Sequence, residues 1–469
     1  MKKEKYYISF TKEMRKDYTI LAPNMLPMHF KLILNVFKGR GYKMELLETQ
    51  GRDIIETGLK YVHNDTCYPA ILVIGQFINA LQSGKYDPKK TALLLSQTGG
   101  GCRASNYIAL LRKALKNAGY GYVPVISFSL GGLEEHPGFK ITLPLWHRMF
   151  YAVIYGDLLL SLVNQVKPYE INSGESEALA ERYCREIADE MNSDGISFKK
   201  VKRRTAEILK SFSKIPTNKN EKVKVGVVGE IYVKFSPFGN NNLVDFLVSE
   251  GAEAVLPGLL DFCLYCVINN IADAKLYGRG RLKEPFVWLA YRFVTKKQRE
   301  IIDLMKEEGH FRPPTPIDKT AKHIMDYIGI GAKMGEGWLL PAEMLELYES
   351  GVPNIVCAQP FGCLPNHIFG KGMMKPLKTK NPDINIVAID YDASATGVNQ
   401  ENRIKLMLAN AREQMKNSHK PSPTIGGANA IHHEQNRAAM DNKQSHAAAG
   451  NSERLSDTEN SDKKPTAKV

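Results

Sequence analysis

Three of the seven cysteines in this chain of 469 residues occur in similar local settings. Cys67 stands in Asn-Asp-Thr-Cys-Tyr-Pro, Cys102 follows three glycines, and Cys363 stands in Phe-Gly-Cys-Leu-Pro. The two Cys-x-Pro sequences favour a helix start after the cysteine, because proline suits the first helical turn. The glycine run lets the backbone approach its neighbours closely. We therefore expect each thiol in the loop after a strand, at the N-terminus of the next helix.

This placement would suit metal binding. Free N–H groups and the positive end of the helix dipole stabilise anions, and they lower the pKa of a thiol toward the thiolate that binds metal. In parallel α/β sheets such loops line the crevice at the carboxyl ends of the strands. Three thiolates from distant positions suit an iron–sulfur cluster with one iron left open better than zinc, whose structural sites draw paired ligands from Cys-x-x-Cys. The alternative is three small buried hydrophobic residues.

The other four cysteines carry weaker signals. Cys263 and Cys266 form Cys-x-x-Cys inside an apolar helical run, where burial and cluster ligation are both open. Cys357 ends the strand that leads to Cys363, and its thiol can point into the core or into the crevice. Cys184 lies in a charged helix and has no predicted role. The odd number of cysteines excludes a complete disulfide framework. The basic N-terminus lacks the apolar core of a secretion signal, so we expect a cytoplasmic protein with reduced thiols.

The elements that must position these residues alternate between strands and helices. The first half has short strand-like runs at 18–22, 44–47, 92–95 and 123–128, separated by helical spacing at 28–37, 68–81, 104–118 and 143–166. Such alternation implies a parallel sheet covered on both faces. Residues 175–212 follow as one or two charged amphipathic helices. The second half has strand-like runs at 223–233, 252–256, 354–358 and 384–389, with helical segments dominating from 259 to 348.

The predicted fold is therefore α/β, with two Rossmann-like parallel-sheet lobes, a helical insert and a metal cluster in the crevice between the lobes. The expected boundaries are an N-terminal lobe at 1–170, a helical connector at 171–221, a second lobe with the insert at 222–416 and a tail at 417–469. The tail is rich in Ser, Asn, Ala, Lys and His and nearly lacks large apolar residues. It cannot offset the entropy of ordering, so we expect it to be disordered.

Charge and hydropathy restrict the partners. The chain has 63 Lys and Arg against 50 Asp and Glu, a net charge of +13. A basic protein favours polyanionic partners, among which a phosphorylated cofactor such as coenzyme A qualifies. The basic run at 199–204 reads as a solvated helix face, and no recognition motif for nucleic acid accompanies it. No apolar stretch approaches the roughly 20 residues of a spanning helix, so we expect neither nucleic acid nor a membrane as a partner.

Several motifs together resemble the 2-hydroxyacyl-CoA dehydratase-like family, and more narrowly its branch related to the C-terminal portion of large acyl-CoA dehydratase activase proteins. They are NDTCYP, QTGGGCRASNY, VGEIYVK, QPFGCLPNH and DYDASATGVNQENR, and the resemblance extends from about residue 15 to residue 416. It implies that Cys67, Cys102 and Cys363 hold a 4Fe-4S cluster. It also implies radical dehydration of a 2-hydroxyacyl-CoA bound at the open iron. A separate ATP-hydrolysing activase of actin-like fold would supply one low-potential electron.

The chain departs from this family in two ways. Dehydratases usually pair two related subunits, so a related second subunit or a homodimer is expected. Gly99, Gly100 and Gly101 lead into Cys102 and Arg103 rather than the Gly-Lys-Ser/Thr of a P-loop, so we expect no intrinsic ATP site. One rival is an ATP-dependent reductase of small molecules with a double-cubane 8Fe-9S cluster, in which Cys263, Cys266 and Cys357 supply further ligands. The other is a non-catalytic electron-transfer or interaction subunit.

A few polar residues complete the candidate site. Arg103 and Lys234 are candidates for the coenzyme A phosphates, with surface solvation as the alternative. The catalytic candidates are Glu230, at a strand end, and His63 and His367, which flank motif cysteines and could donate a proton or a hydrogen bond. The remaining candidates have a capping or turn role as the alternative: Asp65, Asp390, Asp392 and Asn399.

Overall fold

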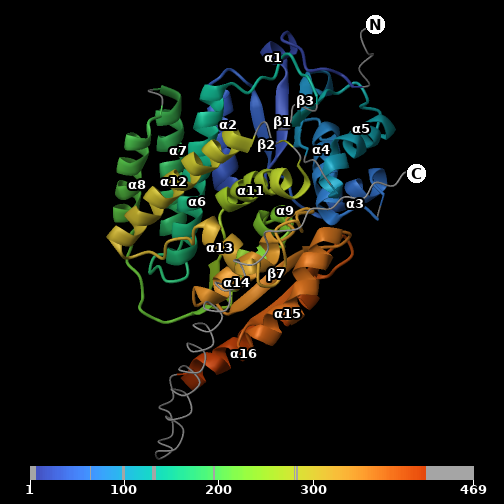
Figure 1. Ribbon diagram of the computed structural model, residues 1–469. Helices are drawn as coiled ribbons and strands as arrows, with labels where there is room; N and C mark the ends of the chain where they lie inside the picture. Colours follow the sequence, from blue (N-terminus) through green and yellow to red (C-terminus); the bar gives the residue numbers. More distant parts are fainter. Residues whose placement is uncertain are drawn as a thin grey trace, which may run out of the picture. The chain divides into compact units, whose positions relative to one another are not determined.

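The computed structural model describes residues 7–63, 65–97, 101–128, 134–193, 196–278, 280 and 284–418. Residues Met1–Glu413 form one compact unit, and Gln414–Val469 form another. Both sheets lie in the first unit (Figure 1). The predicted disorder of 417–469 concerns residues that, from 419 onward, lie outside the described part of the chain.

The first sheet has four parallel strands in the order β2-β1-β3-β4. Its strands are β1 (Thr19–Pro23), β2 (Met44–Leu47), β3 (Thr91–Ser96) and β4 (Val125–Phe128). The helices around it are α1 (Met14–Asp17), α2 (Pro27–Lys38), α3 (Arg52–Tyr61), α4 (Tyr68–Gln82), η1 (Pro88–Lys90), η2 (Arg103–Asn106) and α5 (Tyr107–Asn117). The central strands β1 and β3 are apolar because they are covered on both faces. All four predicted strands are present here.

The second sheet also has four parallel strands, in the order β6-β5-β7-β8. Its strands are β5 (Val223–Gly229), β6 (Ala252–Val255), β7 (Asn354–Pro360) and β8 (Asn385–Tyr391). Its shorter helices are α9 (Ile231–Phe235), α10 (Leu243–Ser249), η3 (Asn366–Lys371) and α15 (Gly372–Lys380), and α16 (Gly397–Ser418) follows β8. The α/β prediction with two parallel sheets is confirmed.

One predicted element is wrong in part. The strand expected over 223–233 ends at Gly229, and α9 begins at Ile231. The carboxylate of Glu230 accepts a hydrogen bond from the N–H of Val233 and so caps the new helix. The apolar run therefore contains a strand and a short helix, and periodicity alone did not separate them.

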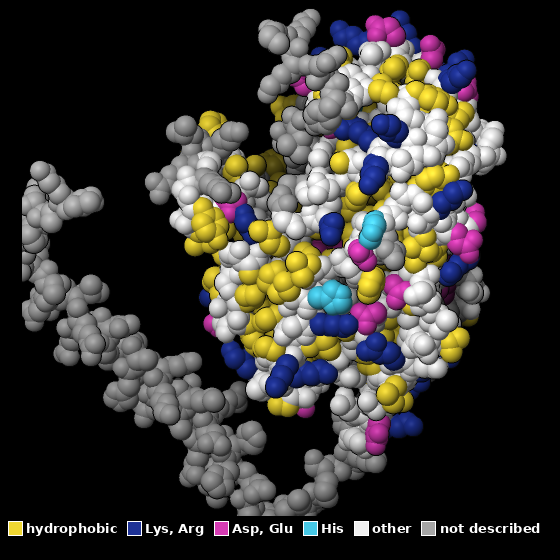
Figure 2. Space-filling model, turned by 90° about the vertical axis from the view of Figure 1, so that its right-hand side faces the viewer, with side chains coloured by type: hydrophobic (Ala, Val, Ile, Leu, Met, Phe, Trp, Pro, Cys, Tyr) yellow, Lys and Arg dark blue, Asp and Glu magenta, His cyan; other side chains and the backbone are white. Residues whose placement is uncertain are grey.

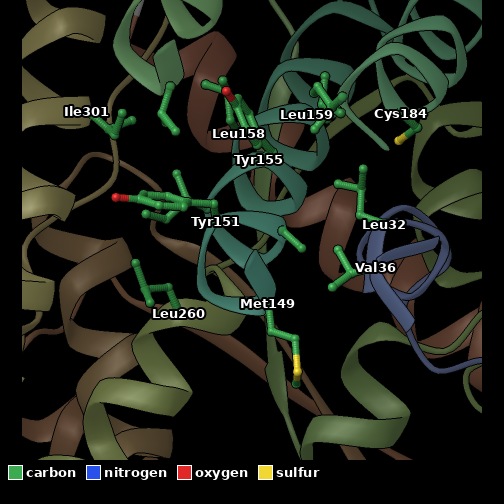
Figure 3. Close-up of a cluster of buried hydrophobic side chains, with 14 of the residues drawn as sticks. Leu32, Val36, Met149, Tyr151, Tyr155, Leu158, Leu159, Cys184, Leu260 and Ile301 are labelled. Carbon is green, nitrogen blue, oxygen red and sulfur yellow. The ribbon is translucent and has the colours of Figure 1, made fainter. Parts of the chain in front are cut away.

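Long helices form a third layer beside the sheets (Figure 1). They are α6 (Leu143–Val166), α7 (Glu175–Ser193), α8 (Phe198–Phe212), α11 (Leu259–Tyr277), α12 (Glu284–Glu308), α13 (Ile317–Ile324) and α14 (Leu339–Glu349). The largest core of buried side chains lies among them, around Tyr151, Tyr155 and Leu159 of α6 (Figure 3). Cys184 of α7 packs in this core, so its thiol is part of the apolar interior.

Helix α6 is long and apolar enough to cross a membrane by length and composition. However, 72% of its most apolar window is buried inside the protein. Its neighbours include α2, α7, α8, α11 and strand β6, and buried side chains of α6 such as Tyr151 and Leu159 pack among them (Figure 3). These contacts explain its apolar character as that of a central core helix.

Candidate functional site

The loop that carries Cys67 is in direct backbone contact with the loop that carries Cys363. Cys67 precedes the first residue of α4, and the N–H of Tyr68 donates to the carbonyl of Phe361 over 3.0 Å. Gly362 has φ of +73°, and a Cβ placed on it would stand 3.1 Å from the Cα of Cys67. Cys67 and Cys363 pack with Ala70 in one small buried cluster. Two thiols that are distant in the sequence, one beside each sheet, therefore lie in one group of buried side chains.

Cys102 reaches the same region from the end of β3. It precedes η2, which continues into α5. The first residue of α5 is Tyr107, whose hydroxyl oxygen lies 2.8 Å from the Sγ of Cys67. A negative charge on Cys102 raises the pKa of Cys67, and one on Cys67 raises that of Cys363. Cys67 and Cys363 thus share one buried group of side chains, and Cys102 lies near enough for its charge to affect the pKa of Cys67.

A third loop closes this region from the segment before α14. The N–H of Gly101 donates to the Sδ of Met334 over 3.3 Å. A Cβ on Gly335, whose φ is +60°, would stand 2.8 Å from Pro365, close after Cys363. The next residue, Glu336, is buried. Sequence reasoning did not identify Glu336, although its position between Gly335 and Gly337, both with positive φ, marks a tight turn that a glycine pattern indicates.

Glu230 and Glu336 share the N-terminus of α9. The carboxylate of Glu230 accepts the N–H of Val233 over 2.9 Å, and that of Glu336 accepts the N–H of Ile231 over 3.1 Å. Charge on either carboxylate raises the pKa of Cys102 and of Cys363, so both carboxylates lie near these cysteines. The predicted candidate Glu230 therefore has a second carboxyl group beside it.

Burial controls the protonation of the whole group. It raises the pKa of Cys67 to about 12, and it raises the pKa of Cys102 and Cys363 as well. The expected lowering of thiol pKa at helix N-termini is therefore wrong, because desolvation outweighs the helix dipole. Burial, followed by the charge of Glu336, raises the pKa of Glu230 to about 8. At neutral pH the site holds protons, which a bound cationic centre would displace from the thiols.

The expectation that each thiol follows a strand holds for two of the three. Cys102 follows β3 and Cys363 follows β7, whereas Cys67 follows α3. The extra helix α3, which sequence reasoning did not identify, packs closely on α4: the Cβ of an alanine at Gly58 would stand 2.2 Å from the carbonyl oxygen of Ile71. This packing places the start of α4 at the carboxyl end of the sheet although no strand leads to it directly.

The weaker cysteine candidates do not join the group in the same way. Cys357 lies inside the core of the second sheet with Val228 and Met344, and its Sγ approaches the side chain of Asn366. On α11, Cys263 is exposed and Cys266 is half-buried. Burial, followed by the charge of Glu336, raises the pKa of Cys266, so this thiol lies within electrostatic range of Glu336.

Within the described residues, no group of three or more His, Cys, Asp or Glu side chains is arranged to hold a single metal ion. A cluster makes a different demand, because each of its irons takes its own thiolate. Thiols that bind one cluster therefore stand apart from each other instead of meeting at one ion.

The histidine candidates occupy different environments. His63 is exposed, and its Nδ1 lies 3.3 Å from a carboxylate oxygen of Asp65. The N-cap residue of α4 is Cys67, and no side chain caps this helix, so Asp65 has no capping role. His367 is half-buried in η3, and its Nδ1 accepts a hydrogen bond of 2.5 Å from the amide of Gln359. Since His367 is placed by a buried partner, its geometry is the more defined of the two.

The two cations predicted to meet coenzyme A lie in different environments. Arg103 is exposed beside Cys102. Lys234 is 3% exposed, and its ammonium group lies 3.0 Å from the carboxylate of Glu343, which is also buried. An ammonium group bound inside the protein cannot reach a phosphate at the surface, so the prediction for Lys234 is wrong.

The late motif joins the two sheets. Asp390 pairs with Lys371 over 2.8 Å, while Asp392 accepts hydrogen bonds from the backbone of Ser394 and Ala395 and so forms a turn. The guanidinium group of Arg52 in α3 donates to the carbonyl of Ala393 over 2.9 Å. This loop therefore has a structural role, and the exposed Asn399 lies in the first turn of α16.

No protein-family model matches the chain, and no curated protein matches it either. A functional proposal therefore depends on the geometry of the three thiols and two carboxyl groups.

Proposed function

We propose that this chain is an iron–sulfur protein of the 2-hydroxyacyl-CoA dehydratase type. The observation that supports it most is the convergence of Cys67, Cys102 and Cys363 from loops beside two different sheets. Buried thiols with raised pKa values are poor free nucleophiles, because the thiolate is the reactive form. A cationic centre between them would stabilise the thiolates, and it would account for buried thiols that lie near each other.

The three cysteines would hold a 4Fe-4S cluster in a crevice between the lobes, with α11–α14 as a helical insert that closes one side. When bound, the cluster would supply a one-electron carrier and an open iron that acts as a Lewis acid. The surrounding loops would exclude water and oxygen. Arg103, at the exposed rim, would attract the phosphates of an acyl-CoA.

Loss of a hydroxyl group from a substrate requires a proton on the leaving oxygen. Glu230, with a pKa of about 8, holds a proton at neutral pH, and the buried Glu336 beside it shares the same helix terminus. A carboxylic acid with its pKa close to the working pH is suited to general acid catalysis. We therefore assign the proton to Glu230, with Glu336 supporting its protonated state, and leave His367 as the next candidate.

The electron would come from a separate ATP-hydrolysing activase of actin-like fold, and the reaction would take place in the reducing cytoplasm. A related second subunit or a second copy of the chain would complete the enzyme. On the face shown in Figure 2, Lys and Arg side chains are spread among Asp and Glu and do not form a single basic patch. This distribution supports a small phosphorylated substrate more than a nucleic acid.

The rival double-cubane reductase has less support. It needs further thiolates, and Cys357 lies within an apolar core away from the three converging cysteines. Of the weaker candidates, Cys266 is the one that lies within electrostatic range of Glu336. A non-catalytic electron-transfer subunit would share the cluster but would not need the two buried carboxyl groups.

Anaerobic purification followed by iron and sulfide analysis and electron paramagnetic resonance tests the proposal. We expect about four irons per chain, as for a single 4Fe-4S cluster. The variant Cys102→Ala should lose the cluster, whereas Cys184→Ala, which alters a cysteine in the helical core, should keep it. About eight irons per chain would favour the reductase. An iron-free but folded protein, or full iron in Cys102→Ala, would contradict the proposal.

A further inference from the structure

Tyr107 connects the loops of two of the three cysteines. It begins α5, five positions after Cys102 in the chain, and its hydroxyl oxygen lies 2.8 Å from the Sγ of Cys67. Its ring packs against the small cluster of Cys67, Ala70 and Cys363. The phenol therefore lies against the sulfur of Cys67, beside the group of side chains that also contains Cys363.

The phenol remains a hydrogen-bond donor under all ordinary conditions. Burial raises the pKa of Tyr107 well above its usual range, and charge on Cys67, Glu230 and Cys102 raises it further. Once the sulfur of Cys67 is a thiolate it has no proton of its own, so the hydroxyl group must donate and the sulfur must accept. Hydrogen bonds to a charged group are stronger than those between neutral groups.

We propose that Tyr107 is a positioning residue that donates a hydrogen bond to the sulfur of Cys67 and thereby makes reduction of the bound cluster easier. This inference rests on the proposed function. One-electron reduction adds negative charge to the cluster and its sulfur ligands, and a donor aimed at a sulfur stabilises the reduced form more than the oxidised form. The same hydrogen bond fixes the position of Cys67 relative to the loop of Cys102.

The test is the variant Tyr107→Phe, which removes one oxygen atom and leaves the ring. The matched control is Tyr122→Phe, since the side chain of Tyr122 is 48% exposed in the same lobe. Both proteins are loaded anaerobically, their iron is counted, and their reduction potentials are measured by titration followed by electron paramagnetic resonance. We expect full iron in both variants. In Tyr107→Phe the equilibrium between reduced and oxidised cluster should shift about tenfold toward the oxidised form, which lowers the reduction potential by about 59 mV for one electron.

A second measurement uses the unaltered protein. Resonance Raman spectra of the loaded chain in H₂O and D₂O should differ in the iron–sulfur stretching region. The reason is that the phenol O–H of Tyr107, which donates to the sulfur of Cys67, exchanges to O–D in D₂O. This isotope shift should shrink in Tyr107→Phe and stay unchanged in Tyr122→Phe. A purely structural role for Tyr107 would alter stability but would leave both the isotope shift and the potential as they are.

The outcomes separate the two proposals. If the unaltered chain binds no iron, the proposed function fails, and the inference about Tyr107 fails with it. If the chain binds iron but Tyr107→Phe keeps the potential and the isotope shift of the unaltered protein, only the inference is overturned. A lower potential with unchanged iron content supports it.

Discussion

The replacement Gly362→Ala tests whether the loops of Cys67 and Cys363 are in contact. Gly362 has φ of +73°, a left-handed conformation that costs an L-residue about 1–2 kcal/mol. Its new Cβ would stand 3.1 Å from the Cα and 3.2 Å from the backbone nitrogen of Cys67. Backbone atoms at the start of a helix cannot turn away as a flexible side chain does. Overpacking of this kind adds about 1–3 kcal/mol, for a total loss of about 2–5 kcal/mol.

A second glycine provides the control for the conformational part of this cost. Gly351, just after α14, has φ of +80°, and a Cβ placed on it would meet nothing within 4 Å among the described residues beyond its own chain neighbours. Gly351→Ala therefore carries only the left-handed cost of about 1–2 kcal/mol. The difference between the two variants isolates the contact between the loops, since both replacements are chemically identical.

Urea denaturation of the two variants gives the free energies of unfolding, and iron analysis after anaerobic loading reports the site. We expect Gly362→Ala to be less stable than Gly351→Ala by about 1–3 kcal/mol and to bind less iron, because the loop of Cys363 must move away from Cys67. Gly351→Ala should bind the full amount. Equal stability and equal iron in the two variants would refute the argument that these loops meet.

Three further predictions follow from buried groups. Cys357→Ala should keep all its iron while losing about 1 kcal/mol of stability, because its thiol packs in the core; loss of iron would show that it is a ligand. Lys234→Met should lower the free energy of unfolding by about 3–5 kcal/mol, because it leaves Glu343 buried without its partner. The double variant Lys234→Met, Glu343→Leu should regain most of that stability. An equal loss of stability in the single and the double variant would disprove the argument. The free energy of unfolding should fall as pH rises from 4.5 to about 8, because folded Glu230 keeps a proton that the unfolded chain releases. In Glu230→Gln this fall, measured by urea denaturation at both ends of the window, should be shallower, although Asp261, with a pKa raised to about 8, adds to it in the same direction.

Much of the fold was predictable because strands in parallel sheets are short apolar runs that stand out between helices. All eight strands of the described residues coincide with such runs, including the edge strands β2 and β6. The error at 223–233 has a physical cause: the mostly apolar run has no clear period, so the end of β5 is set by the capping contact of Glu230, which only the structure shows. The helix α3 was missed because its polar residues gave no apolar run, although its buried face packs on α4.

The sequence singled out three cysteines of the candidate site, but neither all of their neighbours nor their protonation. Similar loop sequences pointed to Cys67, Cys102 and Cys363, since proline indicates the start of a helix and glycine a close backbone approach. The balance between burial and helix dipole depends on how many atoms surround each sulfur, and that is a property of tertiary packing. The same reason explains why the burial of Lys234 with Glu343 could not be predicted from the sequence. It also explains why Glu336 and Tyr107 were not identified, since their neighbours are distant in the chain.

The contact between the N–H of Tyr68 and the carbonyl of Phe361 joins residues almost three hundred positions apart. During synthesis, the loop of Cys67 therefore meets its partner loop only after Phe361 has been made. The site of the proposed cluster could then be completed only after that point, and a truncated chain that ends before β7 would lack Cys363.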